Sequence, residues 1–223
     1  IYNYSDINTI ADENGFVVCY PIGTTDQYGN RFWNVGYDFH QNQTVDDVGF
    51  ISSLAQYLQQ EYNLSSQNTF ASGMSNGAEM SYMLACQAGD IFKAIAAVAG
   101  TMFGTSWTSC SPQPTPILEI HGTNDNVTLW EGDPDDNYWG PYPGIEEVID
   151  FWIDINVCTS NEDIQLNNLN TIKHSSFRIN ASMSISNDTR FLLVTYKFFS
   201  WSIYSTSFKP SMISSLPFSS LIS

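Results

Sequence analysis

Short apolar segments alternate with segments of helical character over the first 158 residues, and this alternation constrains the fold more than any other feature. Short buried strands are expected at 15–21, 68–73, 93–100 and 116–122. Apolar spacing and end signals predict helices at 45–63, 78–89 and 144–158. Strands that alternate with helices are typical of a parallel sheet. The sequence therefore predicts an α/β fold, a parallel sheet flanked by helices.

The composition changes sharply after Cys158. All 14 glycines precede that residue, and the remainder of the chain is rich in serine. Turns that need a positive φ are hard to build without glycine. We therefore divide the chain into a core, 1–158, and an atypical Ser-rich tail, 159–223, whose structure the sequence does not predict. Two origins of the tail stay open: a shifted or misjoined gene end, or a Ser-rich β appendage.

The charge balance excludes some classes of partner. The formal net charge is −16 and the isoelectric point is about 4.1, which argues against binding of nucleic acid or of an anionic membrane surface. No C-x-x-C or H-E-x-x-H pattern predicts a metal site, and we expect no cofactor. The acidic segment 131–137 lacks the ordered spacing of a calcium loop and is interpreted as a solvated turn. The oligomeric state stays open.

Residues 73–77 read Gly-Met-Ser-Asn-Gly, the pattern G-x-S-x-G. They join the predicted strand 68–73 to the predicted helix 78–89, the setting in which a sharp turn exposes a nucleophilic serine. Such a turn presents Ser75 Oγ above the sheet and places the backbone N–H of Asn76 where an oxyanion forms. The alternative is a Gly-rich turn with a serine that takes no part in catalysis.

A carboxylate follows the later predicted strand at 116–122. Asp125 lies at the carboxyl end of that strand, where the sites of parallel sheets collect. A triad on such a sheet runs in the chain order serine, acid, histidine. Asp125 is therefore the candidate acid that orients an imidazole and stabilises its charged form. Asn124 and Asn126 beside it leave open the alternative of a turn aspartate.

A family resemblance rests on the helix that begins VDDVGF, the GMSNG turn and the HGTND loop, in this order and spacing. Over roughly residues 10–158 the chain resembles the polyhydroxybutyrate-depolymerase-like esterases of the α/β-hydrolase superfamily, alongside the feruloyl and acetyl-xylan esterases of carbohydrate esterase family 1. The resemblance implies a secreted, extracellular serine esterase acting on polyesters, on acyl groups linked to plant polysaccharides or on short-chain esters. It assigns Ser75 as the nucleophile and Asp125 as the acid.

The chain departs from that family at both ends. The family's first strands, whose His-Gly loop supplies the second oxyanion donor, would precede Ile1, so we expect a sheet truncated at the N-terminus. We expect a signal peptide, where the protein has one, to precede Ile1. The family's catalytic histidine follows the last strand in a Gly-Gly-His segment. Here the candidate last strand, within 189–199, is followed by SWSIYST, which has neither histidine nor glycine.

The catalytic base is therefore unknown at this stage. His121 ends the strand before Asp125 and is interpreted as structural. His40 is interpreted as a loop residue. His174 is the histidine that follows Asp125, but it precedes the candidate last strand. Without a base, a serine is a weak nucleophile at neutral pH.

Cysteines and aromatic residues add weaker signals. A bridge between Cys86 and Cys110 would be local and compatible with an exported protein, whereas Cys19 is interpreted as a buried thiol. If the tail 159–223 is not the authentic end of the protein, the disulfide partner of Cys158 would have been lost with that end. Loop aromatics flanking the presumed site either pack locally or form a stacking platform for sugar or aryl groups; they are Trp107, Trp130, Trp139 and Tyr142.

Two further functions compete with the esterase. One is a non-catalytic relative or a gene fragment that binds substrate through its aromatic loops. The other is a carbohydrate-binding module, against which the GMSNG turn argues.

Overall fold

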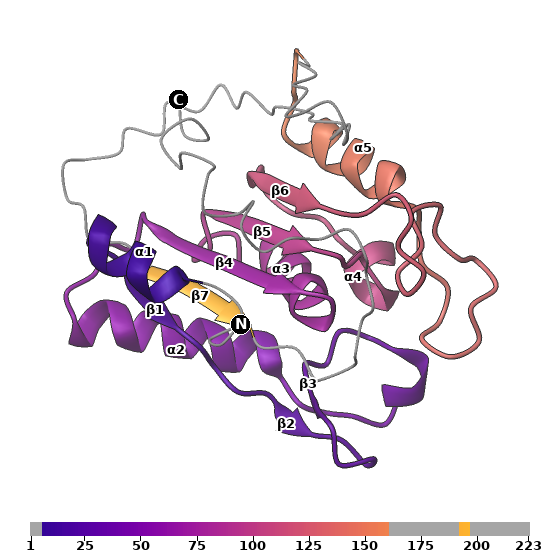
Figure 1. Ribbon diagram of the computed structural model, residues 1–223, viewed down its shortest axis with the longest axis horizontal. Helices are drawn as coiled ribbons and strands as arrows, with labels where there is room; N and C mark the ends of the chain where they lie inside the picture. The colour runs from indigo at the N-terminus through magenta and orange to yellow at the C-terminus, as the bar shows by residue number, and fades with distance from the viewer. Residues whose placement is uncertain (1–5, 161–191, 197–223) are drawn as a thin grey trace.

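A five-stranded parallel sheet forms the centre of the protein, in the order β1-β7-β4-β5-β6 (Figure 1). The computed structural model describes residues 6–160 and 192–196. The strands of the sheet are β1 (Val17–Cys19), β4 (Thr69–Met74), β5 (Ala94–Val98), β6 (Ile117–Ile120) and β7 (Leu192–Tyr196). The prediction of an α/β-hydrolase-like parallel sheet is confirmed.

The helices follow the predicted pattern closely. They are α1 (Ile7–Asn14), α2 (Asp47–Glu61), α3 (Asn76–Gln87), the short α4 (Gly104–Thr108) and α5 (Ile145–Ile155), with a 3₁₀ turn η1 (Asp38–His40). α2 begins where the Asp46 carboxylate accepts the Gly49 N–H at 2.8 Å, which caps the N-terminus of the helix. No helix of the described ranges is long and apolar enough to cross a membrane.

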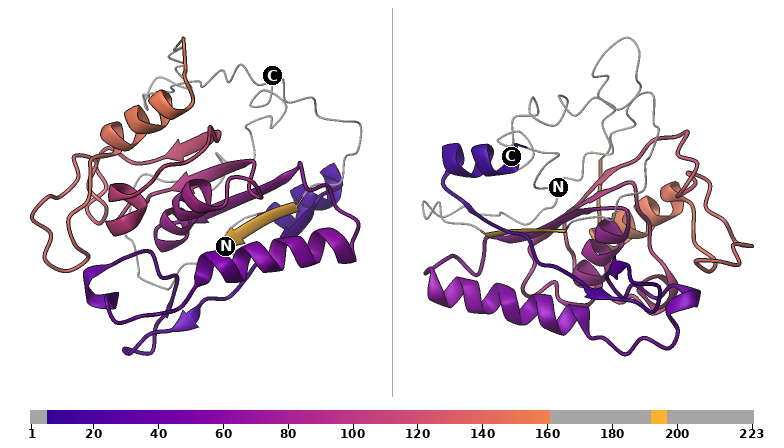
Figure 2. Two further views of the ribbon diagram at one scale, coloured as in Figure 1. Left: turned by 180° about the vertical axis from the view of Figure 1, so that it is seen from behind. Right: turned by 60° about the horizontal axis from the view of Figure 1, so that its bottom comes forward.

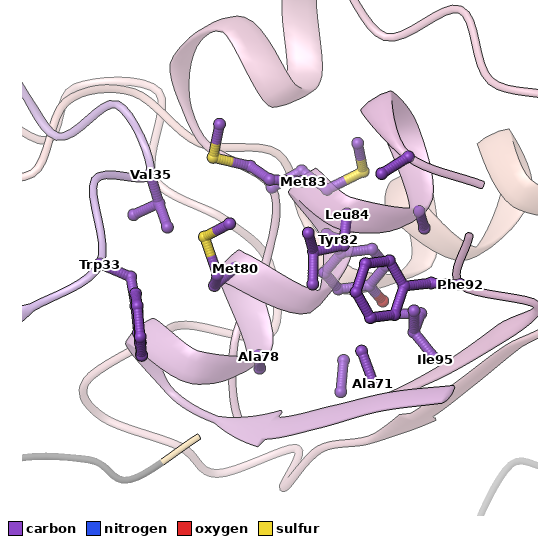
Figure 3. Packing of buried hydrophobic residues seen from close by; sticks show 14 of the residues in the cluster. Trp33, Val35, Ala71, Ala78, Met80, Tyr82, Met83, Leu84, Phe92 and Ile95 are labelled. Carbon is purple, nitrogen blue, oxygen red and sulfur yellow. The ribbon is translucent and has the colours of Figure 1, made fainter. Parts of the chain in front are cut away.

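The helices form layers around the sheet. α2 and α3 lie on one face, and α1 lies on the other (Figure 2). α5 contacts α3 through Trp152, which stacks on Tyr82 with ring centroids 6.4 Å apart. The core surrounds α3, where Met80, Tyr82 and Leu84 are buried among side chains of the sheet and loops (Figure 3). The packing around α3 thus holds the N-terminus of this helix in a fixed position.

Sequence periodicity missed several short elements. α1, α4, η1 and a small antiparallel hairpin, β2 (Thr24–Thr25) with β3 (Arg31–Phe32), were not expected. The strand predicted within 189–199 is present as β7, but it lies inside the sheet between β1 and β4. Residues 161–191 and 197–223 of the predicted tail lie outside the described residues.

The parallel arrangement brings three connections to one edge. Because the paired strands run in the same direction, the residues that follow β1, β4 and β6 all leave the sheet at its carboxyl edge. These connections are the loop 20–46, the turn at Ser75 and the loop 121–144 (Figure 1). The sequence-predicted residues Ser75 and Asp125 therefore lie at the same edge.

Candidate active site

Ser75 occupies a sharp turn between β4 and α3. Its backbone has φ 53° and ψ −123°, a conformation that is costly for a residue with a side chain. The turn is held from both sides: the Ser75 N–H donates to Val98 O at 2.8 Å, and its carbonyl accepts the Ala78 N–H at 2.7 Å. Ser75 is half-buried. The fold thus holds a strained serine at the first position before a buried helix.

Glycine is required on both sides of this turn by close backbone approach. A Cβ at Gly73 would lie 2.3 Å from the carbonyl carbon of Gly77. A Cβ at Gly100, after β5, would lie 2.9 Å from the Ser75 carbonyl oxygen. Real Cβ atoms essentially never approach so closely, so larger residues would push α3 off the sheet. The two glycines of G-x-S-x-G are explained in part by this crossing of strand and helix.

Asn76, the first residue of α3, is clamped to the loop that follows β3. Its side-chain Oδ1 accepts the Trp33 N–H at 2.8 Å, and its Nδ2 donates to the Trp33 carbonyl at 3.0 Å. Asn76 is buried. This two-point contact fixes the orientation of the helix N-terminus, where the Asn76 N–H is directed away from the helix body. The expected oxyanion donor thus sits on a backbone whose position is set by its own side chain.

A buried carboxyl lies one turn further along α3. The Tyr37 hydroxyl is hydrogen-bonded to Glu79 Oε2, and Asn76 Nδ2 reaches the same hydroxyl at 3.4 Å. Glu79 is 2% exposed. Its burial raises its pKa to about 8, against which the hydrogen bonds from Tyr37 and Asn76 act. Glu79 therefore carries a proton at neutral pH and adds no charge beneath the turn.

Asp125 lies in a tight turn after β6. One carboxylate oxygen, Oδ1, accepts the backbone N–H groups of Val127 at 2.8 Å and Thr128 at 3.1 Å. The other, Oδ2, lies 3.8 Å from His121 Nε2. Its side chain is 20% exposed. Asp125 thus caps its own turn with one oxygen and leaves the other directed toward an imidazole.

His121 belongs to a buried chain of polar side chains. Its Nδ1 contacts Glu119 Oε1 at 3.1 Å and its Nε2 contacts the Thr128 carbonyl at 2.9 Å. A carbonyl only accepts, so Nε2 carries a hydrogen. Tyr82 donates to the second oxygen of Glu119 at 2.7 Å. This chain ties the loop that holds Asp125 to β6 and α3.

The pKa of His121 reflects this environment. Burial opposes the imidazolium charge, but the hydrogen bonds to Glu119 and Thr128 and the nearby carboxylates outweigh burial and raise the pKa of His121 above its ordinary value. Burial likewise raises the pKa of Glu119, with His121 and Tyr82 acting in the opposite direction. Both ring nitrogens of His121 are thus occupied by structural partners.

His40 is engaged elsewhere. Its Nε2 lies 3.2 Å from Asp26 Oδ2, and its ring packs against Phe32 and Phe39 with centroids 4.1 and 4.2 Å away. The contacts of His40 and His121 that the structure describes do not include Ser75. His174 lies outside the described residues.

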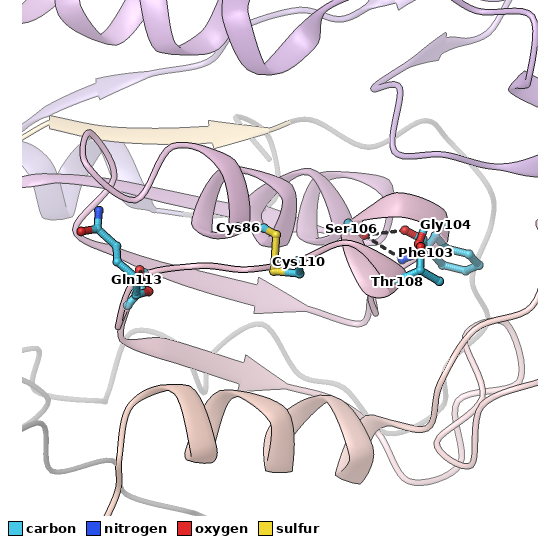
Figure 4. The surroundings of a disulfide bond; sticks show 8 residues. Cys86, Phe103, Gly104, Ser106, Thr108, Cys110 and Gln113 are labelled. Carbon is cyan, nitrogen blue, oxygen red and sulfur yellow. Dashed lines mark hydrogen bonds between the residues drawn. A yellow bond between two sulfur atoms is a disulfide. The ribbon is translucent and has the colours of Figure 1, made fainter.

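A disulfide joins Cys86 at the end of α3 to Cys110 after α4 (Figure 4). The expected local bridge is confirmed. Cys19 and Cys158 are free and partly buried, and burial raises the pKa of each thiol. Disulfides persist mainly in oxidising compartments.

The sequence left two alternatives for the loop aromatics, local packing or a stacking platform, and the described ring contacts of Trp107, Trp130 and Tyr142 are local. Tyr142 is 4% exposed and packs on Phe103, so its ring belongs to the core. Trp107 packs against Phe151, and Trp130 packs against His121. The Trp139 carbonyl accepts the Asp38 N–H at 2.9 Å. The burial of Tyr142 therefore agrees with local packing, the first of the two alternatives.

Other candidate sites lie away from Ser75. A cavity of about 240 Å³ is bordered by Asn34, Tyr37, His40, Gln41 and Met83 among others, and Ser75 does not line it. Within residues 6–160 no group of three or more histidine, cysteine or acidic side chains is arranged to hold a metal ion. In the segment 131–137, the carboxylates of Asp133 and Asp136 accept backbone N–H groups of their own turns.

Sequence reasoning missed the buried polar residues behind the turn: Tyr37, Glu79, Tyr82 and Glu119. One signal was available for Glu79, which stands on the helix four residues after Ser75 and is surrounded in the sequence by Ala78 and Met80. A charged residue among apolar neighbours on a core helix needs a partner. The partner, Tyr37, is 42 residues away along the chain, and no local pattern identifies it.

The sequence was compared with models of known protein families. Residues 2–184 match the family described as Esterase PHB depolymerase. This range includes Ser75, Asn76 and Asp125, the residues that the sequence singled out.

Several curated proteins are similar over parts of the chain. A bifunctional acetylxylan esterase/xylanase of Neocallimastix patriciarum is 33% identical over 134 residues, 58% of this chain and 18% of that protein. Feruloyl esterase B of Piromyces equi is 28% identical over 67% of this chain and 28% of its own length. A poly(3-hydroxybutyrate) depolymerase of Ralstonia pickettii is 26% identical over 56% of this chain and 25% of its own. The chain thus spans less than a third of the length of these relatives.

Proposed function

The chain belongs to the Esterase PHB depolymerase family, and from this premise we propose that it is a carboxylic ester hydrolase with Ser75 as its nucleophile and Asp125 as its acid. The observation that carries the proposal is the strained backbone of Ser75, φ 53° and ψ −123°, at the start of a buried helix. Such strain persists only where the surrounding structure enforces it, and it clusters at functional sites. Here the Gly73–Gly77 crossing and the Val98 carbonyl enforce it.

The reaction follows from this geometry. Ser75 Oγ attacks the ester carbonyl carbon and forms a new C–O bond while its proton passes to an imidazole base. The carbonyl oxygen gains the negative charge and accepts the Asn76 N–H at the positive end of α3. The ester C–O bond then breaks, and the alcohol leaves with the proton. Water repeats the attack on the acyl-serine, which releases the acid and restores Ser75.

In this proposal Asp125 acts through Oδ2, the carboxylate oxygen that caps no turn. Its Oδ1 is held by two backbone N–H groups. In this proposal Oδ2 orients the imidazole that serves as base, although the imidazole that faces Oδ2 among the described residues, His121 at 3.8 Å, is engaged with Glu119 and Thr128. The partners of His121 and His40 support structural roles for those two histidines. The proposal therefore names no base among the described residues.

A second candidate function is a non-catalytic relative that binds ester substrates without cleaving them. The observation that favours it is the engagement of both described histidines with partners other than Ser75. Because triad members act as a unit, loss of the base costs roughly 10⁶-fold in turnover. This candidate predicts that Ser75 has only the reactivity of an ordinary hydroxyl.

The substrate is an ester, as in the relatives, whose names include acetylxylan, feruloyl and poly(3-hydroxybutyrate) esters. In this proposal the protein acts outside the cell. The Cys86–Cys110 disulfide supports that location because such bonds form and persist in oxidising surroundings.

Covalent labelling tests the proposal. A fluorophosphonate transfers its phosphorus group to an activated serine with loss of fluoride, and mass spectrometry of peptides locates it. We expect one label, on the peptide that contains Ser75, and no label in Ser75→Ala. Ser53→Ala, at an exposed serine of α2, is the matched control and keeps the label. A folded chain that takes up no label supports the non-catalytic candidate and overturns the esterase.

A further inference from the structure

The side chain of Asn76 pairs with both backbone groups of one residue in the loop 20–46. Its Oδ1 accepts the Trp33 N–H at 2.8 Å, and its Nδ2 donates to the Trp33 carbonyl at 3.0 Å. A carboxamide carries an acceptor and a donor side by side, so it satisfies a backbone N–H and a backbone carbonyl together. Asn76 and Trp33 are 8% and 2% exposed, so water does not compete for these bonds. The pair is therefore a fixed contact between the first residue of α3 and a residue 43 positions earlier in the chain.

The partner in this contact is itself held on both sides. Phe32, before Trp33, belongs to β3, which pairs with β2. The N–H of Asn34, after Trp33, donates to the Asp47 carboxylate at 2.7 Å, at the start of α2. The Trp33 side chain lies in the core beside the first turn of α3 (Figure 3). The Trp33 backbone is thus a well-anchored partner that holds Asn76 in place.

The contact is made by the side chain of Asn76 and leaves its backbone N–H available. Outside α3, the hydrogen bonds of Asn76 to other described residues involve its Oδ1 and Nδ2. Its N–H is the first of α3, one of the N–H groups that a helix does not satisfy internally. In the proposed esterase, this N–H donates to the oxyanion. Asn76 thus combines a bound side chain with a free backbone donor.

An oxyanion donor depends on its position more than most hydrogen-bond donors do, because a misplacement of about 1 Å can cost roughly a hundredfold in rate. The Asn76 N–H belongs to the same peptide unit as the Ser75 carbonyl, which accepts the Ala78 N–H at 2.7 Å. The φ of Ser75 is 53°, and a relaxation of this strained backbone would turn that peptide unit and its N–H. The Asn76 side chain opposes such a turn, because it fixes the Cα next to that N–H.

A second buried contact, between Tyr37 and Glu79, also joins the loop 20–46 to α3. It lies about one turn further along the helix, so α3 stays attached to the loop when the Asn76 amide is removed. Asn76 Nδ2 reaches the Tyr37 hydroxyl at 3.4 Å, which is longer than either contact to Trp33. The two contacts therefore have separable roles: the Tyr37–Glu79 contact attaches the helix, and the Asn76 amide sets its first peptide unit.

We propose that Asn76 is a positioning residue: by pairing with the Trp33 backbone, its side chain holds the Asn76 N–H where the negative charge of the transition state forms. This inference rests on the proposed esterase function and adds a role for the side chain to that of the backbone N–H. Loss of the amide lowers kcat and leaves KM largely unchanged, because the interaction that it supports is made in the transition state. A merely structural contact would lower stability without changing the kcat of the folded protein.

Kinetics of p-nitrophenyl acetate hydrolysis by the full chain test this role. Asn76→Ala removes both contacts to Trp33, and we expect kcat to fall roughly ten- to a hundredfold, no more than the loss caused by removal of a whole oxyanion donor. Asn156→Ala is the matched control, since Asn156 is a buried asparagine at the C-terminal end of α5 whose Nδ2 donates to the Thr115 carbonyl at 2.9 Å. We expect this control to be less stable than the parent and to keep its kcat.

Asn76→Asp gives a second test, which depends on pH. A protonated aspartic acid accepts the Trp33 N–H and donates to the Trp33 carbonyl, as the amide does, whereas an ionised carboxylate only accepts and faces that carbonyl with a second acceptor. The titratable groups that contact this position are Tyr37 and Glu79. Because the parent contains both groups, the ratio of kcat in the variant to kcat in the parent removes their own titration from the comparison. We expect this ratio to be higher at about pH 5 than at about pH 8.

Hydrogen exchange measures the contact itself, independently of activity. The Trp33 N–H should exchange slowly in the parent and in Asn156→Ala and faster in Asn76→Ala, as read by mass spectrometry on the peptide that contains Trp33. Asn76→Asp, which keeps the size of the side chain, takes the place of an Asn76→Ala variant that does not fold.

The outcomes separate this inference from the esterase proposal. The positioning role alone is overturned if the parent is active and Asn76→Ala keeps its kcat, if the kcat ratio of Asn76→Asp is constant with pH, or if Asn156→Ala lowers kcat as much as Asn76→Ala does. Unchanged exchange of the Trp33 N–H in Asn76→Ala also overturns it. A folded parent that does not hydrolyse the ester overturns both proposals.

Discussion

The side chains behind the Ser75 turn are positioned by contacts between residues that are far apart in the sequence. Tyr37 and Glu79 are both buried and satisfy each other, and Asn76 joins them through its side chain. A buried carboxyl with a neutral hydrogen-bond partner is held in its protonated form. Glu79 is therefore a neutral, buried side chain that joins α3 to the loop of Tyr37 by a hydrogen bond.

We predict that Glu79 makes the protein less stable as pH rises. The carboxyl ionises near its ordinary value of 4.5 in the unfolded chain, but its pKa is about 8 in the folded protein. Between these values the unfolded chain has lost a proton that the folded protein keeps. The free energy of unfolding therefore falls as pH rises through this window, by up to about 1.4 kcal/mol per pH unit from this group.

Glu79→Gln removes this titration and keeps a side chain that can accept from Tyr37. Urea unfolding of Glu79→Gln and of the parent at pH 5, 6.5 and 8 should show the variant gaining stability relative to the parent as pH increases. Glu61→Gln, at an exposed glutamate of α2, should follow the parent. Parallel pH profiles for Glu79→Gln and the parent would show that Glu79 ionises normally.

At the level of elements, the sequence predicted what local patterns encode. The periodicity of Val48, Ile51 and Leu58 located α2, and the apolar runs located β4, β5 and β6. The short elements inside the loop 20–46 were missed because two-residue strands carry no period. The same limit applies to the site: Ser75 and Asp125 follow motifs, whereas the partners of Asn76 and Glu119 are 43 and 37 residues away.

The position of β7 in the sheet could not be predicted from local sequence patterns. Its apolar run predicted a strand, but only pairing can place that strand between β1 and β4. In the described residues β1 has β7 as its strand partner, through Val17–Leu192 to Cys19–Val194. β7 thus holds β1, and with it the start of the loop that carries Tyr28 and Phe39, against the rest of the sheet.

We therefore predict that Val194→Pro abolishes cooperative unfolding. Proline lacks the backbone N–H and is not tolerated in the middle of a sheet. Val194→Thr keeps the N–H and favours an extended backbone, so it is the control for the position. Thermal unfolding followed by circular dichroism compares the two variants. A proline variant that melts like the parent would mean that 192–196 does not form an interior strand.

For the molecule as a whole, the Cys86–Cys110 disulfide closes a loop of 24 residues next to α3. By the loop-entropy relation, such a crosslink stabilises a protein by about 3 kcal/mol through its effect on the unfolded chain. We predict a loss of this size in the Cys86→Ala/Cys110→Ala variant, measured by urea unfolding. Added reductant should destabilise the parent by a similar amount and leave the variant unchanged. Destabilisation of the variant by reductant would show that the effect does not come from this bond.

The whole arrangement directs the loops after β1, β4 and β6 to one edge of a parallel sheet, where the Ser75 turn and the Asp125 turn lie. The proposed esterase activity depends most on the activation of Ser75 as a nucleophile.

The direct measurement is the initial rate of p-nitrophenyl acetate hydrolysis by the parent, Ser75→Ala and Ser53→Ala, each shown to be folded by circular dichroism. The account predicts rates above the buffer background for the parent and Ser53→Ala, and a rate at background for Ser75→Ala. Equal rates for the three proteins would contradict it and would leave Ser75 a strained but unreactive turn residue.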